Sequence, residues 1–158
     1  MNHRINPKLA DEQAAPLGDS TIVGPTEVAD VMTAKVVTLS PHHSFSEVAN
    51  LMNDRYFRHC VVVDARGQIV GVISDRDILR ALARNPNARS KSLDQIMTHN
   101  PVTVRRNTPI AEAVRKIVSK RINCLPVVEE DGSVCGIVTS TDLLKSYQQL
   151  LEMMHEAR

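Results

Sequence analysis

The chain has 158 residues, enough for one compact domain or for two small ones that share a core. Its 19 Lys and Arg residues almost balance 18 Asp and Glu residues, which argues against a nonspecific nucleic-acid binder, because such proteins need a strongly basic surface. Aromatic residues make up only 3% of the chain and Trp is absent, so a platform that stacks single-stranded bases is not expected.

The N-terminal residues 1–24 are polar, carry Pro7, Pro16 and Gly18, and are expected to form a flexible arm. They contain no apolar stretch typical of a signal peptide, and no segment of the chain approaches the roughly 20 apolar residues of a membrane span. The three cysteines lack C-x-x-C spacing and do not indicate a secreted disulfide framework. We therefore expect a soluble cytoplasmic protein that does not enter a membrane.

An internal repeat with an offset of 65 residues organises the rest of the chain. Aligned without a gap, residues 28–82 (the first repeat) and 93–147 (the second repeat) share eleven identical positions out of 55. Ordinary amino-acid usage predicts about three such identities by chance. The identical pairs include Met32 and Met97, Thr33 and Thr98, Gly71 and Gly136, and Asp77 and Asp142.

The first repeat predicts a helical turn at 27–32, an extended piece at 36–39 and a helix behind the capping box Ser44-x-x-Glu47. Strands at 60–64 and 69–73 around Gly67 form a hairpin, and a final helix starts at Asp77. The order of elements is therefore β-α-β-β-α.

The second repeat predicts the same elements, with a capped turn at 93–97, an extended piece at 102–104 and a helix for which Thr108 is the expected N-cap. Strands at 125–129 and 134–138 flank Gly132, and the last helix starts at Asp142. We divide the chain into the arm (1–24), a first motif (25–84), a linker (85–91), a second motif (92–148) and a helical C-terminal extension (149–158).

Two short motifs, Ser74-x-x-Asp77 and Thr139-x-x-Asp142, lie where a strand ends and a helix begins. One interpretation is helix capping, in which the hydroxyl or carboxylate accepts hydrogen bonds from free N–H groups. The other is ligand binding, because a helix N-terminus attracts phosphate and an acidic side chain can accept hydrogen bonds from ribose hydroxyls. The two roles are compatible, and the residues alone leave both open.

Each repeat resembles a CBS motif, and the pair resembles a Bateman module, over about residues 27–147. The residues that carry the resemblance are Met-Thr at 32–33 and 97–98, the hairpin strands at 61–64 and 125–128, and the segments 71–77 and 136–142. The resemblance implies an α/β fold in which two motifs pack their small sheets face to face about a pseudo-twofold axis. It also implies a homodimer, and a module without an attached catalytic domain.

The resemblance further implies that Ser74 and Thr139 contact phosphate, that Asp77 and Asp142 contact ribose, and that each motif builds its own adenine pocket. The candidate ligand-binding residues are Thr38, His59, Cys60, Ser74, Asp75, Arg76 and Asp77 in the first motif, and Thr103, Cys124, Leu125, Pro126, Thr139, Ser140, Thr141 and Asp142 in the second. We rank the second site first, because Leu125-Pro126 is the family's usual strand start and Cys60-Val61 departs from it.

Several cations lie near these motifs. Arg76 is a candidate phosphate clamp, since a guanidinium suits phosphate oxygens, with a solvated surface charge as the alternative. Four others precede the hairpin strands and are candidates to reach phosphate bound by the facing motif, with the same alternative: Arg55, Arg58, Lys120 and Arg121.

The expected function is regulatory. AMP, ADP, ATP, NAD or S-adenosylmethionine, with Mg²⁺ accompanying ATP, shifts the relative pose of the motifs, and an unidentified partner protein reads that pose. No nucleophile–base pair is visible, so we assign no catalytic residue and do not expect an enzyme. We assign no metal site either, and interpret Cys60 and Cys124 as buried structural thiols. The alternatives are a ligand-independent interaction scaffold, a nucleic-acid regulator that uses the arm, and a metal- or redox-responsive protein that uses Cys60 and Cys124.

Overall fold

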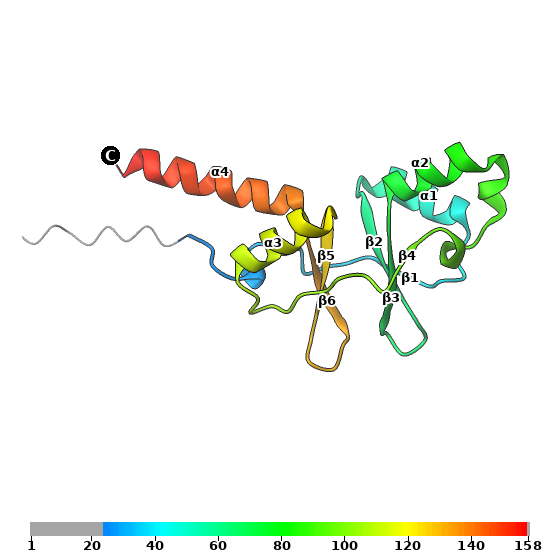
Figure 1. Cartoon of the computed structure of the whole chain (residues 1–158), viewed down its shortest axis with the longest axis horizontal. Helices are drawn as coiled ribbons and strands as arrows, with labels where there is room; N and C mark the ends of the chain where they lie inside the picture. Colours follow the sequence, from blue (N-terminus) through cyan, green and yellow to red (C-terminus); the bar gives the residue numbers. More distant parts are fainter. Residues whose placement is uncertain (1–23, 158) are drawn as a thin grey trace, which may run out of the picture.

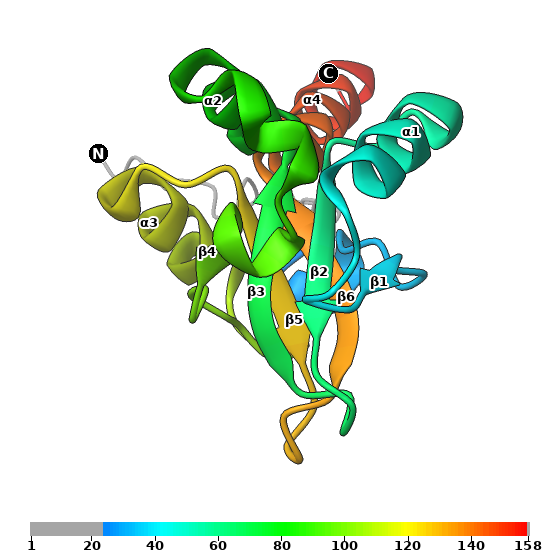
Figure 2. The same cartoon turned by 90° about the vertical axis from the view of Figure 1, so that its right-hand side faces the viewer.

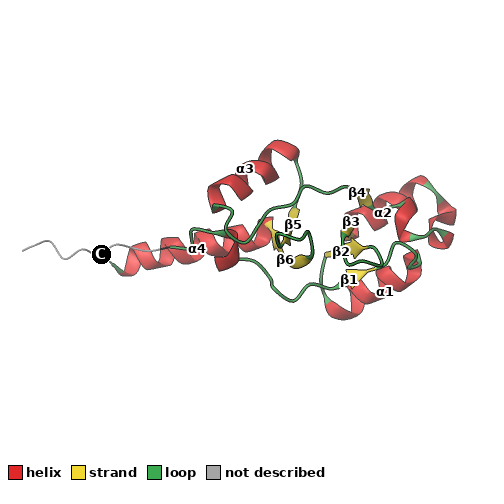
Figure 3. Ribbon diagram, turned by 90° about the horizontal axis from the view of Figure 1, so that it is seen from below, coloured by secondary structure: helices red, strands yellow, loops and turns green. Residues whose placement is uncertain are grey.

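Four helices flank two small sheets in the computed structural model, which describes residues 24–157. The helices of this part of the chain are α1 (Phe45–Arg55), α2 (Asp75–Arg84), α3 (Ile110–Lys120) and α4 (Ser140–Glu156). Helices α1 and α2 lie on one side of the paired sheets, and α3 and α4 lie on the other (Figure 3). Among the described residues, no helix is both long and apolar enough to cross a membrane.

The first sheet has the strand order β1 (Thr38–Leu39), β2 (His59–Val63), β3 (Ile69–Ser74) and β4 (Thr98–His99). Strand β1 is parallel to β2, and the other neighbours are antiparallel. The second sheet pairs β5 (Cys124–Val128) with β6 (Val134–Thr139). The hairpins β2–β3 and β5–β6 lie side by side with their turns at the same end (Figures 1 and 2). This arrangement confirms the expected α/β pair of motifs with facing sheets.

The two repeats exchange the residues that follow their first helical turns. Thr98 of the second repeat pairs with Val72 in the first sheet, whereas Thr33 of the first repeat pairs with Ile137 in the second. The two pairs are equivalent, because Thr33 and Thr98, and likewise Val72 and Ile137, are separated by the repeat offset of 65. The exchange is therefore reciprocal, and each sheet contains a piece of the other repeat.

The hydrophobic cores are exchanged in the same way. Leu93, in the 3-10 helix η3 (Leu93–Gln95), is fully buried among residues of the first repeat, including Phe45 and Ile73. Val28, in η1 (Val28–Asp30), is buried in the core of the second repeat. A third cluster joins the two sheets and contains Val61, Cys124 and Ile137.

The local signals of the sequence are mostly confirmed. The Ser44–Glu47 capping box starts α1, with the Glu47 carboxylate accepting from the Ser44 N–H at 2.7 Å. The expected N-cap Thr108 is wrong: Pro109 holds that position, and the Thr108 hydroxyl accepts from the Arg105 N–H at 2.9 Å and closes the preceding turn.

Two other expected segments also differ from the prediction. The extended piece at 102–104 is reduced to a single parallel bridge between Val104 and Val127, and the strand β4 lies earlier, at the exchanged residues. The expected linker contains a 3-10 helix, η2 (Pro86–Ser90), whose Ala88 is fully buried. Most of the connection between the repeats is therefore folded against the first core.

Candidate functional site

Two clefts open where helices α2 and α4 begin. We call them the Ser74 cleft, of about 300 Å³, and the Thr139 cleft, of about 540 Å³, and both volumes suit a small-molecule ligand. The Ser74 cleft is lined by His59, Val72, Ser74, Arg76, Asp77, Arg80, Thr98, Asn100, Pro101, Val102, Arg121, Ile122, Asn123 and Cys124. The Thr139 cleft is lined by Thr33, Lys35, Val36, Val37, Tyr56, Phe57, Arg58, His59, Ile137, Thr139, Thr141 and Asp142.

The repeat offset relates the two clefts at every position of the Thr139 cleft. Each of its lining residues, moved by 65 positions up or down the chain, falls on a residue that lines the Ser74 cleft. Only His59 and Arg80 of the Ser74 cleft have no counterpart in the Thr139 cleft. The clefts are therefore pseudo-symmetric versions of one site.

Each cleft combines the helix start of one repeat with two segments of the other, namely the residues after its first helical turn and the residues that lead into its first hairpin strand. In the Thr139 cleft, Thr139 and Asp142 of the second repeat face residues 33–37 and 56–59 of the first. The sequence-based prediction built each adenine pocket from the strands of a single motif, whereas both repeats line each cleft. The physical cause is the exchange, because the residues after each first turn cross between the sheets and pass the opposite helix.

The clefts bring together about half of the candidate residues. His59, Ser74, Arg76, Asp77 and Cys124 line the Ser74 cleft, and His59, Thr139, Thr141 and Asp142 line the Thr139 cleft. Arg58 and Arg121, which the sequence placed towards the facing motif, also line clefts of the facing repeat. Arg55 and Lys120 line neither cleft.

The remaining candidates do not line either cleft. Cys60, Leu125 and Pro126 are buried in the interior. Thr38 lines a shallow cavity beside the first hairpin, and Thr103 lines neither cleft. Asp75 and Ser140 belong to the helix starts, but their backbone N–H groups donate to the carbonyls of Arg58 and Asn123, each at 3.0 Å.

Sequence reasoning missed the crossing residues 33–37 and 98–102 as cleft walls. Their identities between repeats, Thr33 with Thr98 and Val37 with Val102, marked them as important. The offset alone does not say which helix start they face, because both choices satisfy the same repeat.

Ser74 and Thr139 both cap their helices. The Ser74 hydroxyl accepts from the Asp77 N–H at 3.2 Å, and the Asp77 Oδ2 accepts from the Ser74 N–H at 2.9 Å and from its hydroxyl at 2.7 Å. Thr139 and Asp142 repeat the arrangement at 3.2, 2.8 and 2.8 Å. The capping interpretation is confirmed for both motifs, and it fixes the aspartates at the mouths of the clefts.

The two aspartates differ at their second oxygen. The Asp77 Oδ1 accepts from the Arg80 guanidinium at 3.1 Å, whereas within the described part of the chain no hydrogen bond reaches the Asp142 Oδ1. Asp142 therefore keeps a carboxylate oxygen that is available to a ligand hydroxyl.

A sequence model of the CBS domain matches residues 28–84 and 93–149. The chain belongs to the CBS domain family. It carries two CBS domains, whose matched ranges together hold both capped helix starts.

Curated relatives are mostly much longer than this CBS pair. A homoserine O-acetyltransferase of Methanohalobium evestigatum is 34% identical over 124 residues, which cover 78% of this chain and 24% of that protein. The chain thus spans about a quarter of the length of the first curated relatives that it matches.

Two solved CBS structures resemble this fold over nearly their full length. The CBS domain pair of protein MJ0100, in complex with 5′-methylthioadenosine and S-adenosyl-L-methionine, superposes with a TM-score of 0.73 at 31% identity, covering 78% of this chain and 97% of that one. CBSX2 in complex with AMP superposes with a TM-score of 0.68 at 27% identity, covering 80% and 98%.

In this CBS pair, His59 lines both clefts at once. Burial lowers the pKa of its imidazole below the ordinary value of 6.5, and the nearby carboxylates of Asp75 and Asp77 only partly oppose that shift. The ring is therefore neutral near pH 7 and can donate or accept one hydrogen bond to either cleft.

We expect this CBS pair to lose stability as the pH falls below 6.5. Because the pKa of His59 is lower in the folded chain than in the unfolded chain, the unfolded state binds the extra proton first. The free energy of unfolding should therefore decrease as the pH falls below 6.5, and His59→Gln should flatten that slope. Denaturant titrations at a series of pH values measure the free energy of unfolding. Equal pH slopes for the wild type and His59→Gln would contradict the lowered pKa of His59.

The thiols of the CBS pair are protonated at neutral pH. Burial raises the pKa of Cys60 to about 12 and that of Cys124 to about 12. Among residues 24–157, no group of three or more His, Cys, Asp and Glu side chains is arranged to hold a metal ion.

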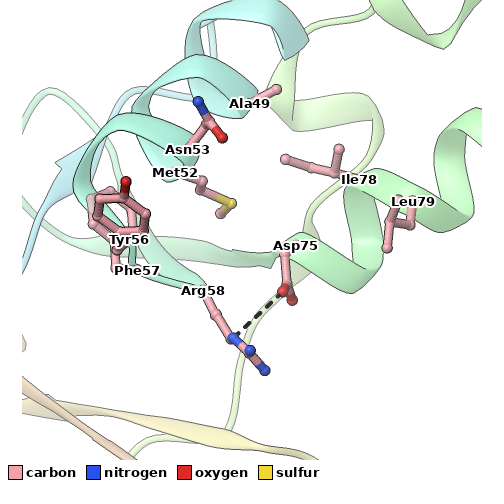
Figure 4. Close-up of a pocket in the computed structure, with 9 residues that line it drawn as sticks. All are labelled: Ala49, Met52, Asn53, Tyr56, Phe57, Arg58, Asp75, Ile78 and Leu79. Carbon is pink, nitrogen blue, oxygen red and sulfur yellow. Dashed lines mark ion pairs between the residues drawn. The ribbon is translucent and has the colours of Figure 1, made fainter.

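A third cavity, of about 420 Å³, lies between α1 and α2 on the outer face of the first CBS domain (Figure 4). Met52 and Ile78 form its floor, while Tyr56 and Leu79 are exposed at its sides. The Arg58 Nε lies 3.9 Å from the Asp75 Oδ2 at its edge. Since Arg58 also lines the Thr139 cleft, this third cavity and the Thr139 cleft share a wall.

Proposed function

We propose that this CBS pair is a regulatory module that binds adenosine-containing ligands in its clefts. The observation that carries the proposal is the Asp142 carboxylate, held by the cap at the mouth of the Thr139 cleft with one oxygen free. A carboxylate in that position suits a pair of ribose hydroxyls, as acidic side chains do in dinucleotide-binding folds.

The opposite wall of the Thr139 cleft suits a flat, apolar base with polar edges. Val36, Val37 and Ile137 supply apolar surface, and among the described residues the N–H groups of Lys35 and Val36 make no hydrogen bond. These donors are available to the acceptor nitrogens of adenine. Lys35 and Arg58 supply positive charge for a phosphate group.

The ligand class follows from what similar proteins hold. The MJ0100 pair binds 5′-methylthioadenosine and S-adenosyl-L-methionine, and CBSX2 binds AMP. Adenosine is common to all three, so we propose AMP, ADP, ATP, NAD or S-adenosylmethionine as candidates, with Mg²⁺ accompanying ATP. We further propose that the protein works in the cytoplasm and is not itself an enzyme.

Regulation follows from the crossed construction of the clefts. A ligand in the Thr139 cleft touches Asp142 of one repeat and residues 33–37 of the other, so its binding energy depends on their relative pose. We propose that a ligand selects one pose and that a partner protein distinguishes that pose from the empty one.

A thermal-shift screen tests the proposal. An adenosine ligand at 100 times its dissociation constant should stabilise the fold by about 2.7 kcal/mol, whereas GTP and CTP should stabilise it less. The absence of a shift with every adenosine compound at millimolar concentration would overturn the proposal and favour a ligand-independent scaffold.

We propose that the protein assembles as a homodimer through its helical faces. Leu79 on α2 and Leu144 on α4 occupy equivalent positions and are 64% and 68% exposed, and Tyr56 at the end of α1 is 94% exposed. Exposed large apolar side chains are typical of interaction surfaces, and here they occur on the helices of both repeats. Sedimentation should give twice the monomer mass, and Leu79→Glu with Leu144→Glu should give the monomer. A monomer at high wild-type concentration would contradict the dimer.

Thiol chemistry separates this function from the redox-responsive alternative. With a pKa of about 12, Cys60 and Cys124 should react with a chromogenic disulfide reagent only on the timescale of unfolding at pH 8. The variant Cys135→Ser removes the more exposed third thiol and gives the clean background. Rapid reaction of that folded variant would favour the redox alternative.

A further inference from the structure

The two clefts are equivalent in position but differ in chemistry, and the first difference concerns the aspartates. Asp77 uses Oδ2 in the cap, and its Oδ1 already accepts from Arg80, so a ribose hydroxyl has to share that oxygen with the guanidinium. Lys145 takes the place of Arg80 in the second repeat, and within residues 24–157 it forms no ion pair with Asp142.

The second difference concerns the backbone donors on the opposite wall. The free N–H groups of Lys35 and Val36 correspond to those of Asn100 and Pro101 in the Ser74 cleft. The Asn100 N–H donates to the Val70 carbonyl at 3.3 Å, and proline has no N–H. The Ser74 cleft therefore lacks both donors that the Thr139 cleft offers to a base.

The third difference is the charge of the walls. Arg76 and Arg121 line the Ser74 cleft and form no ion pair within the described chain, whereas Thr141 and Tyr56 hold the equivalent positions in the Thr139 cleft. The cations of the Thr139 cleft are Lys35 and Arg58, of which Arg58 lies 3.9 Å from the Asp75 carboxylate, and that cleft also carries the Asp142 carboxylate without an ion pair in the described chain. With Asp77 paired to Arg80, the unpaired charge of the Ser74 cleft is positive. Guanidinium groups at a helix N-terminus favour phosphate oxygens.

We propose that the Ser74 cleft is an anion cleft that binds a chain of phosphate groups, while the Thr139 cleft binds the nucleoside. This rests on the proposed function, in that it takes the two clefts as the ligand sites. The phosphate chain comes from a nucleoside triphosphate or from a free polyphosphate, which share the chemistry that the arginines recognise. His59 lines both clefts, so the anion and the nucleoside are bound against the same imidazole.

Calorimetric titration of the full chain with inorganic tripolyphosphate, ATP and 5′-methylthioadenosine tests this division. Arg76→Thr installs the residue found at the equivalent position of α4 and touches no described ion pair. It should weaken the binding of a phosphate chain about tenfold and leave 5′-methylthioadenosine unchanged. Arg115→Thr is the control, because it removes the same charge from an exposed position on α3 outside both clefts.

The outcomes separate the sources of the phosphate and the two proposals. Weakened binding of both tripolyphosphate and ATP supports the anion cleft with free polyphosphate as a ligand, and weakened binding of ATP alone supports it with the nucleotide as the source. If Arg76→Thr and Arg115→Thr affect phosphate binding equally, the anion cleft is wrong, although 5′-methylthioadenosine binding would keep the proposed function. If tripolyphosphate binding depends on Arg76 while no adenosine compound binds, the proposed function fails instead.

Discussion

Leu93→Ala is expected to lower the free energy of unfolding by about 2–5 kcal/mol, the usual cost of truncating a fully buried leucine. Leu93 belongs to the second repeat, but the core that it fills belongs to the first, where it packs with Phe45, Val48 and Ile73. The side chain is fully buried, so its removal leaves a cavity that the surrounding strands and helices close only in part. Chemical denaturation of the full chain measures the effect.

The matched control is Asp94→Ala, one residue further along η3, where the side chain is exposed. It should change the free energy of unfolding by no more than about 0.5 kcal/mol. Equal effects of the two substitutions would show that the first turn of the second repeat is not part of the first core, and the crossed clefts would lose their structural basis.

Asp142→Asn is expected to weaken binding of an adenosine ligand at least about tenfold while leaving the melting temperature almost unchanged. The asparagine carbonyl can replace the Oδ2 that accepts from the Thr139 N–H, so the cap persists. Its NH₂ group then occupies the place of the free Oδ1 and offers donors where the ribose hydroxyls need an acceptor. A hydrogen bond to a charged group contributes about 1.5–3 kcal/mol, and 1.4 kcal/mol corresponds to a factor of ten in affinity.

Two further variants separate capping from binding. Asp142→Ala should lose both affinity and about 1 kcal/mol of stability, because it removes the cap as well. Asp77→Asn should affect nucleoside binding little, since Arg80 already occupies the second oxygen of Asp77. Calorimetric titration beside a melting curve reads both effects. If Asp142→Asn binds AMP as tightly as the wild type, Asp142 is a cap and nothing more.

The repeat, the hairpins and the capped helix starts could all be predicted from local sequence signals. The crossed construction of the clefts could not. Val28 and Leu93 are apolar residues at equivalent positions, and either would satisfy the core of its own repeat or of the other. The pattern of apolar residues is the same in both arrangements, so only the packing of the whole chain decides between them.

Some candidate residues lie outside both clefts because their strand is buried on both faces. Pro126 was a candidate for the adenine pocket, but it lies inside β5 with its side chain buried, as does the preceding Leu125. The ion pair of Asp77 has a local signal in the sequence, because Arg80 follows Asp77 by three residues, a spacing at which opposite charges on a helix meet. Lys145 has the same spacing from Asp142 without an ion pair in the described chain, so the difference between the clefts still needed the structure.

A structure of the full chain with AMP tests the central claim most directly, namely that one ligand is held by both repeats. We predict AMP in the Thr139 cleft, with its ribose on the Asp142 carboxylate of the second repeat and its base against the backbone of Lys35 and Val36 of the first. AMP held by residues of a single repeat, or a chain that remains empty at saturating AMP, would contradict it.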